Sequence, residues 1–131
     1  MNEAAVLLIV EDDKKRAELS GFLSGLGIRV DARASLSASP EESGRRNGLF
    51  ALVISPRDGQ RRLPASLGEW KRRRPELAII VLAGPDAAVR YLPWLEDGTL
   101  DHLADPSNPA AIYSAIRSVQ TKDEAHRGVD R

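Results

Sequence analysis

The fold is decided first by a continuous apolar run, Ala5-Val6-Leu7-Leu8-Ile9-Val10, which ends abruptly in Glu11-Asp12-Asp13. The length and β-branched content of this run predict a strand that is buried on both faces. A helix is predicted next, because apolar residues then recur at helical spacing and Gly27 is a natural stop. The inward stripe of that helix is expected to consist of Leu19, Phe22, Leu23 and Leu26.

The same alternation of strand and helix continues to the end of the chain. Further strands are predicted over residues 28–32, 49–55, 77–82 and 100–104, and helices over 40–46 (short and poor), 65–73, 86–97 and from 109 onward. Pro93 is expected to break or kink the fourth helix. The last helix is expected to be capped by Ser107 or Asn108 and to fray from Thr121.

Five strand–helix units with fully apolar strands predict a parallel sheet with helices on both faces, a three-layer, doubly wound α/β fold. In such sheets ligands bind beyond the carboxyl ends of the strands. The first strand is not followed by a glycine-rich phosphate loop, so the motifs for binding dinucleotides and nucleoside triphosphates are missing and no cofactor is expected.

The composition is that of an ordinary globular domain. The 131 residues are 42% apolar and 29% charged, with 19 basic and 19 acidic side chains, so no basic excess favours direct nucleic acid binding. The absence of cysteine excludes disulfides and thiolate metal sites. No apolar run is long enough to span a membrane, and the first residues do not resemble a signal peptide, so a cytoplasmic location is expected.

Four segments that end or follow the predicted strands carry a specific resemblance. They are Val6 to Asp12, Leu52 to Ser55, Ile79 to Leu82, and Gly98 to Pro106, in the right order with plausible gaps. Over about residues 5–120 the chain therefore resembles the receiver domain of bacterial two-component response regulators. The resemblance implies a flavodoxin-like strand order of 2-1-3-4-5 and a role in phosphorelay signal transduction. It divides the chain into a receiver-like domain, residues 1–120, and a polar tail or linker, residues 121–131.

The receiver reaction needs an acceptor aspartate, an acidic pair that helps to hold Mg²⁺, a hydroxyl, a lysine and a switch aromatic residue. In this chain the corresponding positions fall, in that order, on Pro56, on Glu11 and Asp12, on Ala83, on Asp105 and on His102. Only the acidic pair is kept, while the acceptor and hydroxyl are missing and the lysine charge is inverted. The resemblance thus implies a degenerate pseudo-receiver, without enzymatic activity, that acts through protein contacts.

Other interpretations of these residues remain open. Asp58, two residues after Pro56, is an alternative acceptor, although that register would bring Pro56 and Arg57 into a central strand. Glu11 and Asp12 are either solvated charges that favour a helix N-terminus or a weak Mg²⁺ site. The basic run of residues 71–74 either stabilises a helix C-terminus or binds an anionic nucleotide, with Arg57, Arg61 and Arg62 as possible neighbours.

Two further expectations concern the surface and the backbone. A homodimer or a protein partner is expected to bind the face built by the fourth helix, the fifth strand and the last helix. That face is expected to carry Tyr91, Trp94, His102 and Tyr113, whereas Trp70 is expected in the core. The Asp105–Pro106 peptide bond is expected to be cis, as the corresponding bond typically is in the family, which would aim Asp105 at Glu11 and Asp12.

Overall fold

A computed structural model describes residues 5–34, 49–56 and 63–129 of the chain. Five parallel strands form one sheet in the order β2-β1-β3-β4-β5, which confirms the predicted topology. The elements are β1 (Ala5–Ile9), α1 (Asp13–Gly25), β2 (Arg29–Arg33), β3 (Leu49–Ile54), α3 (Leu63–Arg73), β4 (Ala78–Leu82), α4 (Pro85–Glu96), β5 (His102–Ala104) and α5 (Pro109–Val129). The short helix predicted over residues 40–46 lies outside the described residues.

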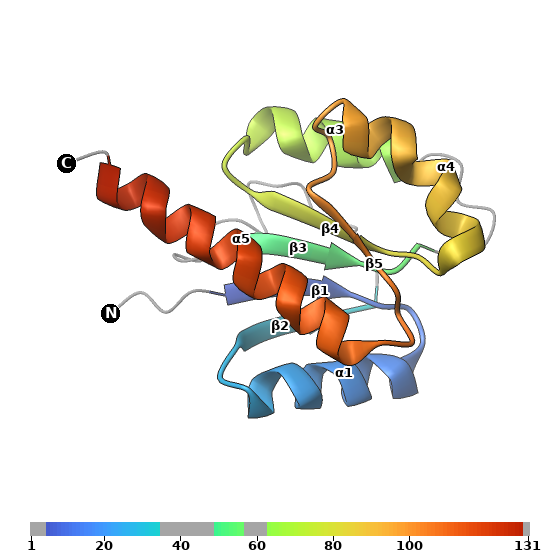
Figure 1. Cartoon of the computed structure of the whole chain (residues 1–131). Coiled ribbons are helices and arrows are strands. Elements are labelled where there is room, and N and C mark those ends of the chain that lie inside the picture. Colours follow the sequence, from blue (N-terminus) through green and yellow to red (C-terminus); the bar gives the residue numbers. More distant parts are fainter. Residues whose placement is uncertain (1–4, 35–48, 57–62, 130–131) are drawn as a thin grey trace.

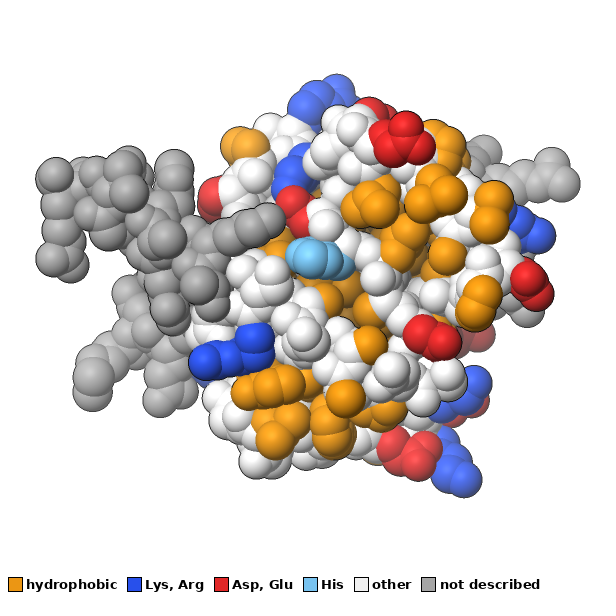
Figure 2. All heavy atoms as spheres, viewed as in Figure 1, with side chains coloured by type: hydrophobic (Ala, Val, Ile, Leu, Met, Phe, Trp, Pro, Cys, Tyr) orange, Lys and Arg blue, Asp and Glu red, His pale blue; other side chains and the backbone are white. Residues whose placement is uncertain are grey.

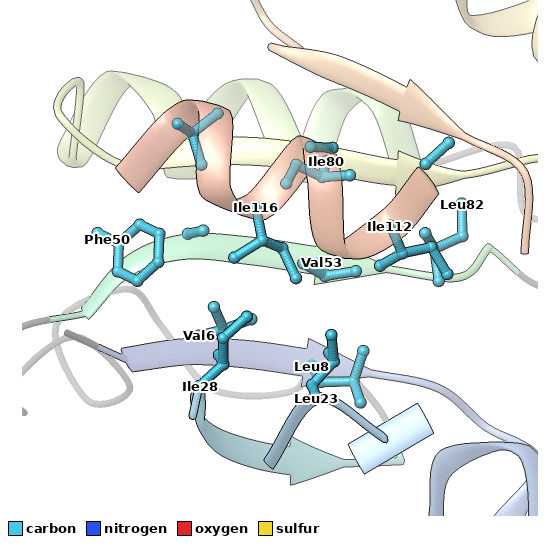
Figure 3. Close-up of a cluster of buried hydrophobic side chains, with 14 of the residues drawn as sticks. Val6, Leu8, Leu23, Ile28, Phe50, Val53, Ile80, Leu82, Ile112 and Ile116 are labelled. Atoms are coloured by element: carbon cyan, nitrogen blue, oxygen red, sulfur yellow. The ribbon is translucent and has the colours of Figure 1, made fainter. Parts of the chain in front are cut away.

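The three inner strands, β1, β3 and β4, are apolar throughout because helices cover both faces of the sheet there (Figure 1). The edge strand β2 carries Arg29, Asp31 and Arg33 and is only partly buried. Along β1, Val6 and Leu8 face a core shared with α1 and α5, the α1/α5 core, which Figure 3 shows. Leu7 and Ile9 face a second core, the α3/α4 core, which includes residues of α3 and partly buried residues of α4. Successive residues of a strand point to opposite faces, so both sets must be apolar.

The first helix only partly matches its predicted stripe. Leu23 is fully buried and Leu19 packs against the core, whereas Phe22 and Leu26 remain 39% and 46% exposed. Leu19 and Leu23, four residues apart, form one line of contacts along the sheet. The adjacent line, with Phe22 and Leu26, is turned toward solvent, so the prediction was wrong for these two residues.

Two expectations about the later helices differ from the structure. Pro93 lies inside α4 without breaking it, since the helix runs on to Glu96, while the alternative of a kink at Pro93 stays a prediction. Pro93 and Val89 are both exposed, so water can reach the turn in which proline removes a hydrogen bond. The expected fraying from Thr121 does not occur either, because α5 continues to Val129. Once a helix is nucleated, each added residue gains a hydrogen bond, and residues 122–125 contain good helix formers.

Among the described helices, none combines the length and hydrophobicity that crossing a bilayer would require. Trp70 is buried, as predicted. The predicted cap of the last helix is confirmed at Asn108, whose side-chain Oδ1 accepts a hydrogen bond of 3.2 Å from the backbone N–H of Ala111.

Candidate functional site at the carboxyl edge of the sheet

The carboxyl ends of the strands meet along one edge of the sheet. Backbone hydrogen bonds continue the ladder beyond the regular strands: Ser55 donates to Ile9 at 2.9 Å, and Ala83 donates to Ala104 at 2.9 Å. The structure therefore brings the segments that follow β1, β3, β4 and β5 side by side, as their positions in a parallel sheet require.

Of the acidic pair after β1, Glu11 and Asp12, one carboxylate binds the start of α1. The Asp12 carboxylate accepts a hydrogen bond of 3.0 Å from the backbone N–H of Lys15 and thereby caps α1. This hydrogen bond holds the pKa of Asp12 below its usual value, although loss of solvation opposes the shift. The Glu11 side chain is exposed. Capping the helix is thus a structural use for one of the two carboxylates.

Arg16 is a cation that the sequence analysis missed at the end of β1. Its Nη1 donates to the carbonyl oxygens of Val10 at 2.8 Å and of Glu11 at 3.2 Å. Its Nη2 pairs with the carboxylate of Asp13. The spacing of Asp13 and Arg16, three residues apart on a helix, was the available signal. A guanidinium therefore satisfies the backbone carbonyls where the first strand ends.

The Asp105–Pro106 bond is trans, so the prediction of a cis bond was wrong. The Asp105 carboxylate turns back to its own loop and accepts hydrogen bonds from the backbone N–H of Ser107 at 2.9 Å and from its hydroxyl at 2.8 Å. These bonds, the backbone one first, hold the pKa of Asp105 below its usual value. The aspartate forms a local turn with Ser107, and that turn competes with the expected orientation toward Glu11 and Asp12.

The described residues contain no group of three or more His, Cys, Asp or Glu side chains that could hold a metal ion. The predicted convergence of Asp105 with Glu11 and Asp12 is therefore not found. Pro56 directly follows Ser55 at the end of β3, and Ala83 is buried within the α3/α4 core. Neither side chain carries a nucleophile or a hydrogen-bond donor. Asp58, the alternative acceptor, lies outside the described residues, as do Arg57, Arg61 and Arg62.

The basic run at the end of α3 is matched by acidic neighbours. Its ion pairs are Lys71 with Asp101, Arg72 and Arg73 with Glu69, and Arg74 with Glu76. Three carboxylates thus neutralise most of the charge of four cations. This arrangement favours the structural interpretation of the run over an anionic ligand site.

The face formed by α4, β5 and α5 carries the four predicted interface residues, although the two α4 aromatics and Tyr113 are partly buried. The ring centroids of Tyr91 and Trp94 lie 6.1 Å apart, and both rings pack against the α3/α4 core. Tyr113 packs against the α1/α5 core. Burial raises the pKa of Tyr91 above its usual value, and Arg90 opposes the shift. His102 is half-buried on β5.

The more exposed apolar side chains of α4 were missed by the sequence analysis. Val89 is 65% exposed and Leu92 is 42% exposed. Figure 2 shows hydrophobic side chains gathered over α4 on this side of the molecule. The sequence does contain a signal for these exposed residues, because α4 carries apolar side chains on more than one side. A helix that packs on a sheet needs only a single apolar stripe.

Comparison with solved structures identifies similar folds. A response regulator receiver domain protein from Clostridium thermocellum is 16% identical with a TM-score of 0.80, covering 94% of this chain and 98% of that chain. A CheY-like receiver domain protein from Methanospirillum hungatei is 17% identical with a TM-score of 0.69, covering 95% and 99%. A putative pilus assembly-related protein from Burkholderia pseudomallei is 18% identical with a TM-score of 0.73, covering 88% of each chain.

No family model and no curated protein matches the sequence. The structural similarity extends over nearly the whole chain, but identities this low show a shared fold alone. The strand order and the layers are those of receiver domains, as the resemblance in the sequence implied.

Proposed function

We propose that this chain is a receiver-type signalling domain that acts through protein contacts without aspartyl phosphorylation. The observation that carries the proposal is the set of residues at the carboxyl edge of a receiver-like sheet. The acceptor position holds Pro56, the hydroxyl position holds Ala83, and the lysine position holds Asp105. The bacterial cytoplasm, where response regulators act, is the proposed location.

The chemistry of phosphoryl transfer supports this proposal. The transferring group is anionic, so its transition state needs cations and a positioned nucleophile. Asp105 supplies no cation at the position where a lysine would neutralise this charge, and its carboxylate is bound to Ser107 in its own loop. Pro56 has no atom that could attack phosphorus. The edge is therefore unsuited to accept or to retain a phosphoryl group.

Exposure to acetyl phosphate and Mg²⁺, followed by intact-mass analysis, tests this proposal. We expect no phosphoryl adduct, and we expect beryllium fluoride to leave the protein unchanged. A phosphorylatable receiver treated in parallel should react with both. A stoichiometric adduct that disappears in Asp58→Asn would overturn the proposal and establish the alternative acceptor.

We further propose that the face formed by α4, β5 and α5 contacts a protein partner or a second copy of the chain. Both helices contact β5, so the three elements form one continuous surface. Val89 and Leu92 supply exposed apolar area, and Tyr91 and Trp94 supply aromatic rings beside it. Aromatic residues are enriched among those that dominate binding energy.

A further inference from the structure

A cavity of about 350 Å³ opens at the carboxyl edge of the sheet, between α1 and the loop that leads into α5. Its apolar wall is formed by Val10, Leu19, Leu82 and Pro106, and its polar groups are those of Lys15, Glu18, Ser55 and Ser107. The volume lies at the lower end of the range, about 300–1,000 Å³, that is usual for small-molecule sites. A mostly apolar wall with a few convergent polar groups is also typical of such sites.

This cavity lies on the α1/α5 side of the strand ends. Val10 and Leu82, which line it, belong to the α1/α5 core, whereas Ala83 belongs to the α3/α4 core. Side chains alternate between the two faces of a strand, so Leu82 and Ala83 point to opposite sides. The cavity is therefore separate from the hydroxyl position discussed above.

Two charged and exposed residues at the cavity favour one class of ligand. Lys15 and Glu18 both line it, and within the described part of the chain no ion pair engages either side chain. A simple anion would be attracted by Lys15 and repelled by Glu18, and a simple cation would experience the reverse. A ligand that carries one charge of each sign satisfies both residues.

We propose that this cavity binds a small zwitterion with an apolar side chain, namely an apolar α-amino acid of the size of leucine or phenylalanine. Lys15 pairs with the carboxylate of the ligand, and Glu18 pairs with its ammonium group. The Ser55 hydroxyl supplies a further hydrogen bond, and the Ser107 oxygen, whose hydrogen is donated to Asp105, accepts one from the ammonium group. Val10, Leu19 and Leu82 take its side chain. The inference does not depend on whether the chain is phosphorylated.

Such a ligand would connect the first helix to the last. Lys15 and Glu18 lie on α1, whereas Pro106 and Ser107 lie in the loop that begins α5. Ligand binding would therefore restrain α1 against the start of the helix that leads to the C-terminus. Receiver-like domains take their input at this edge of the sheet. A small molecule bound there would in this way change the position of α5.

Titration of the full chain with L-leucine and L-phenylalanine, followed by calorimetry and thermal unfolding, tests the proposal. We expect saturable binding at concentrations up to about 10 mM, since ligands this small gain limited affinity, and a rise of a few degrees in the unfolding temperature. Isoamylamine and 4-methylpentanoate, which each lack one charge of leucine, should bind about tenfold more weakly or worse. Absence of binding by both amino acids, or equal binding of the one-charge analogues, would overturn the proposal.

Substitutions locate the site. Lys15→Met and Glu18→Gln should each weaken amino-acid binding about tenfold, and Ser107→Phe should abolish it by filling the opening. Lys14→Met is the matched control, since Lys14 is an exposed neighbour that does not line the cavity. Circular dichroism establishes that each variant is folded. Amino-acid binding that is unchanged in folded Lys15→Met, Glu18→Gln and Ser107→Phe would place the ligand elsewhere and refute the assignment.

Discussion

At the scale of single residues, two acidic side chains at the strand ends accept hydrogen bonds from residues two or three positions further along the chain. Asp12 caps the helix that follows it, and Asp105 closes the turn before α5. Both carboxylates have a lowered pKa because backbone N–H groups donate to them. Asp12, at a position that would help to hold a metal ion in a phosphorylatable receiver, thus has a structural role as a helix cap, and Asp105, at the lysine position, has one in its loop.

The lowered pKa of Asp12 predicts a pH dependence of stability. Ionised Asp12 is favoured in the folded state, so its contribution is present above its unfolded-state pKa, about 4, and is lost as the pH falls through its lower folded-state value. Asp12→Asn keeps an acceptor for the Lys15 N–H but removes the charge. We expect the wild type to exceed this variant in free energy of unfolding at pH 6, and the difference to shrink toward pH 3. Urea unfolding at both values checks this, and a difference that grows on acidification would contradict it.

At the scale of elements, the side chain of Asp101 connects α3 to β4 and to the start of β5. The Asp101 carboxylate accepts from the backbone N–H of Ile79 at 2.7 Å and from the Lys71 ammonium at 2.9 Å. The same ammonium also donates to the carbonyl of Leu77 at 2.9 Å. Because β5 has only three residues, this side chain extends the attachment of its segment to β4 beyond the short ladder.

Removing this contact should destabilise the domain measurably. Asp101→Ala leaves the Ile79 N–H and the Lys71 ammonium without their acceptor, for which we expect a loss of about 2 kcal/mol in free energy of unfolding. Lys71→Met should cost about 1 kcal/mol. Arg72→Met, on the same helix, breaks an exposed ion pair with Glu69 and should stay within about 0.5 kcal/mol. Equal effects of the lysine and arginine substitutions in denaturant unfolding would argue against a special role for Asp101.

At the scale of the whole molecule, two exposed apolar surfaces lie on different helices. One comprises Val89 and Leu92 on α4, and the other comprises Phe22 and Leu26 on α1. In Figure 1 the last turns of α5 run past the amino ends of the strands. Helical continuation to Val129 leaves open the prediction that residues 121–131 lead into a further segment.

The proposed association face gives a prediction at this scale. If the chain dimerises through α4, β5 and α5, the paired substitution Val89→Asp and Leu92→Asp should weaken association at least about tenfold in sedimentation equilibrium. Trp94→Ala and Tyr113→Ala should weaken it as well. Phe22→Asp with Leu26→Asp is the matched control, because it changes two comparably exposed residues on α1. Loss of association in the control alone would assign the interface to α1 instead.

The sequence by itself determined the layers and the strand order, and it located the four strand ends that meet at one edge. Apolar runs, helical spacing and the order of elements are properties of neighbouring residues, and a parallel sheet then allows few topologies. Only the tertiary structure decided where individual side chains point. The turn of Asp105 with Ser107 and the contacts of Arg16 with the end of β1 join residues two to six apart, so local spacing permitted them but did not choose them over other orientations. The cavity beside Lys15 depends on packing between α1, the ends of two strands and the loop before α5, which are far apart in the chain, and no local pattern records such packing.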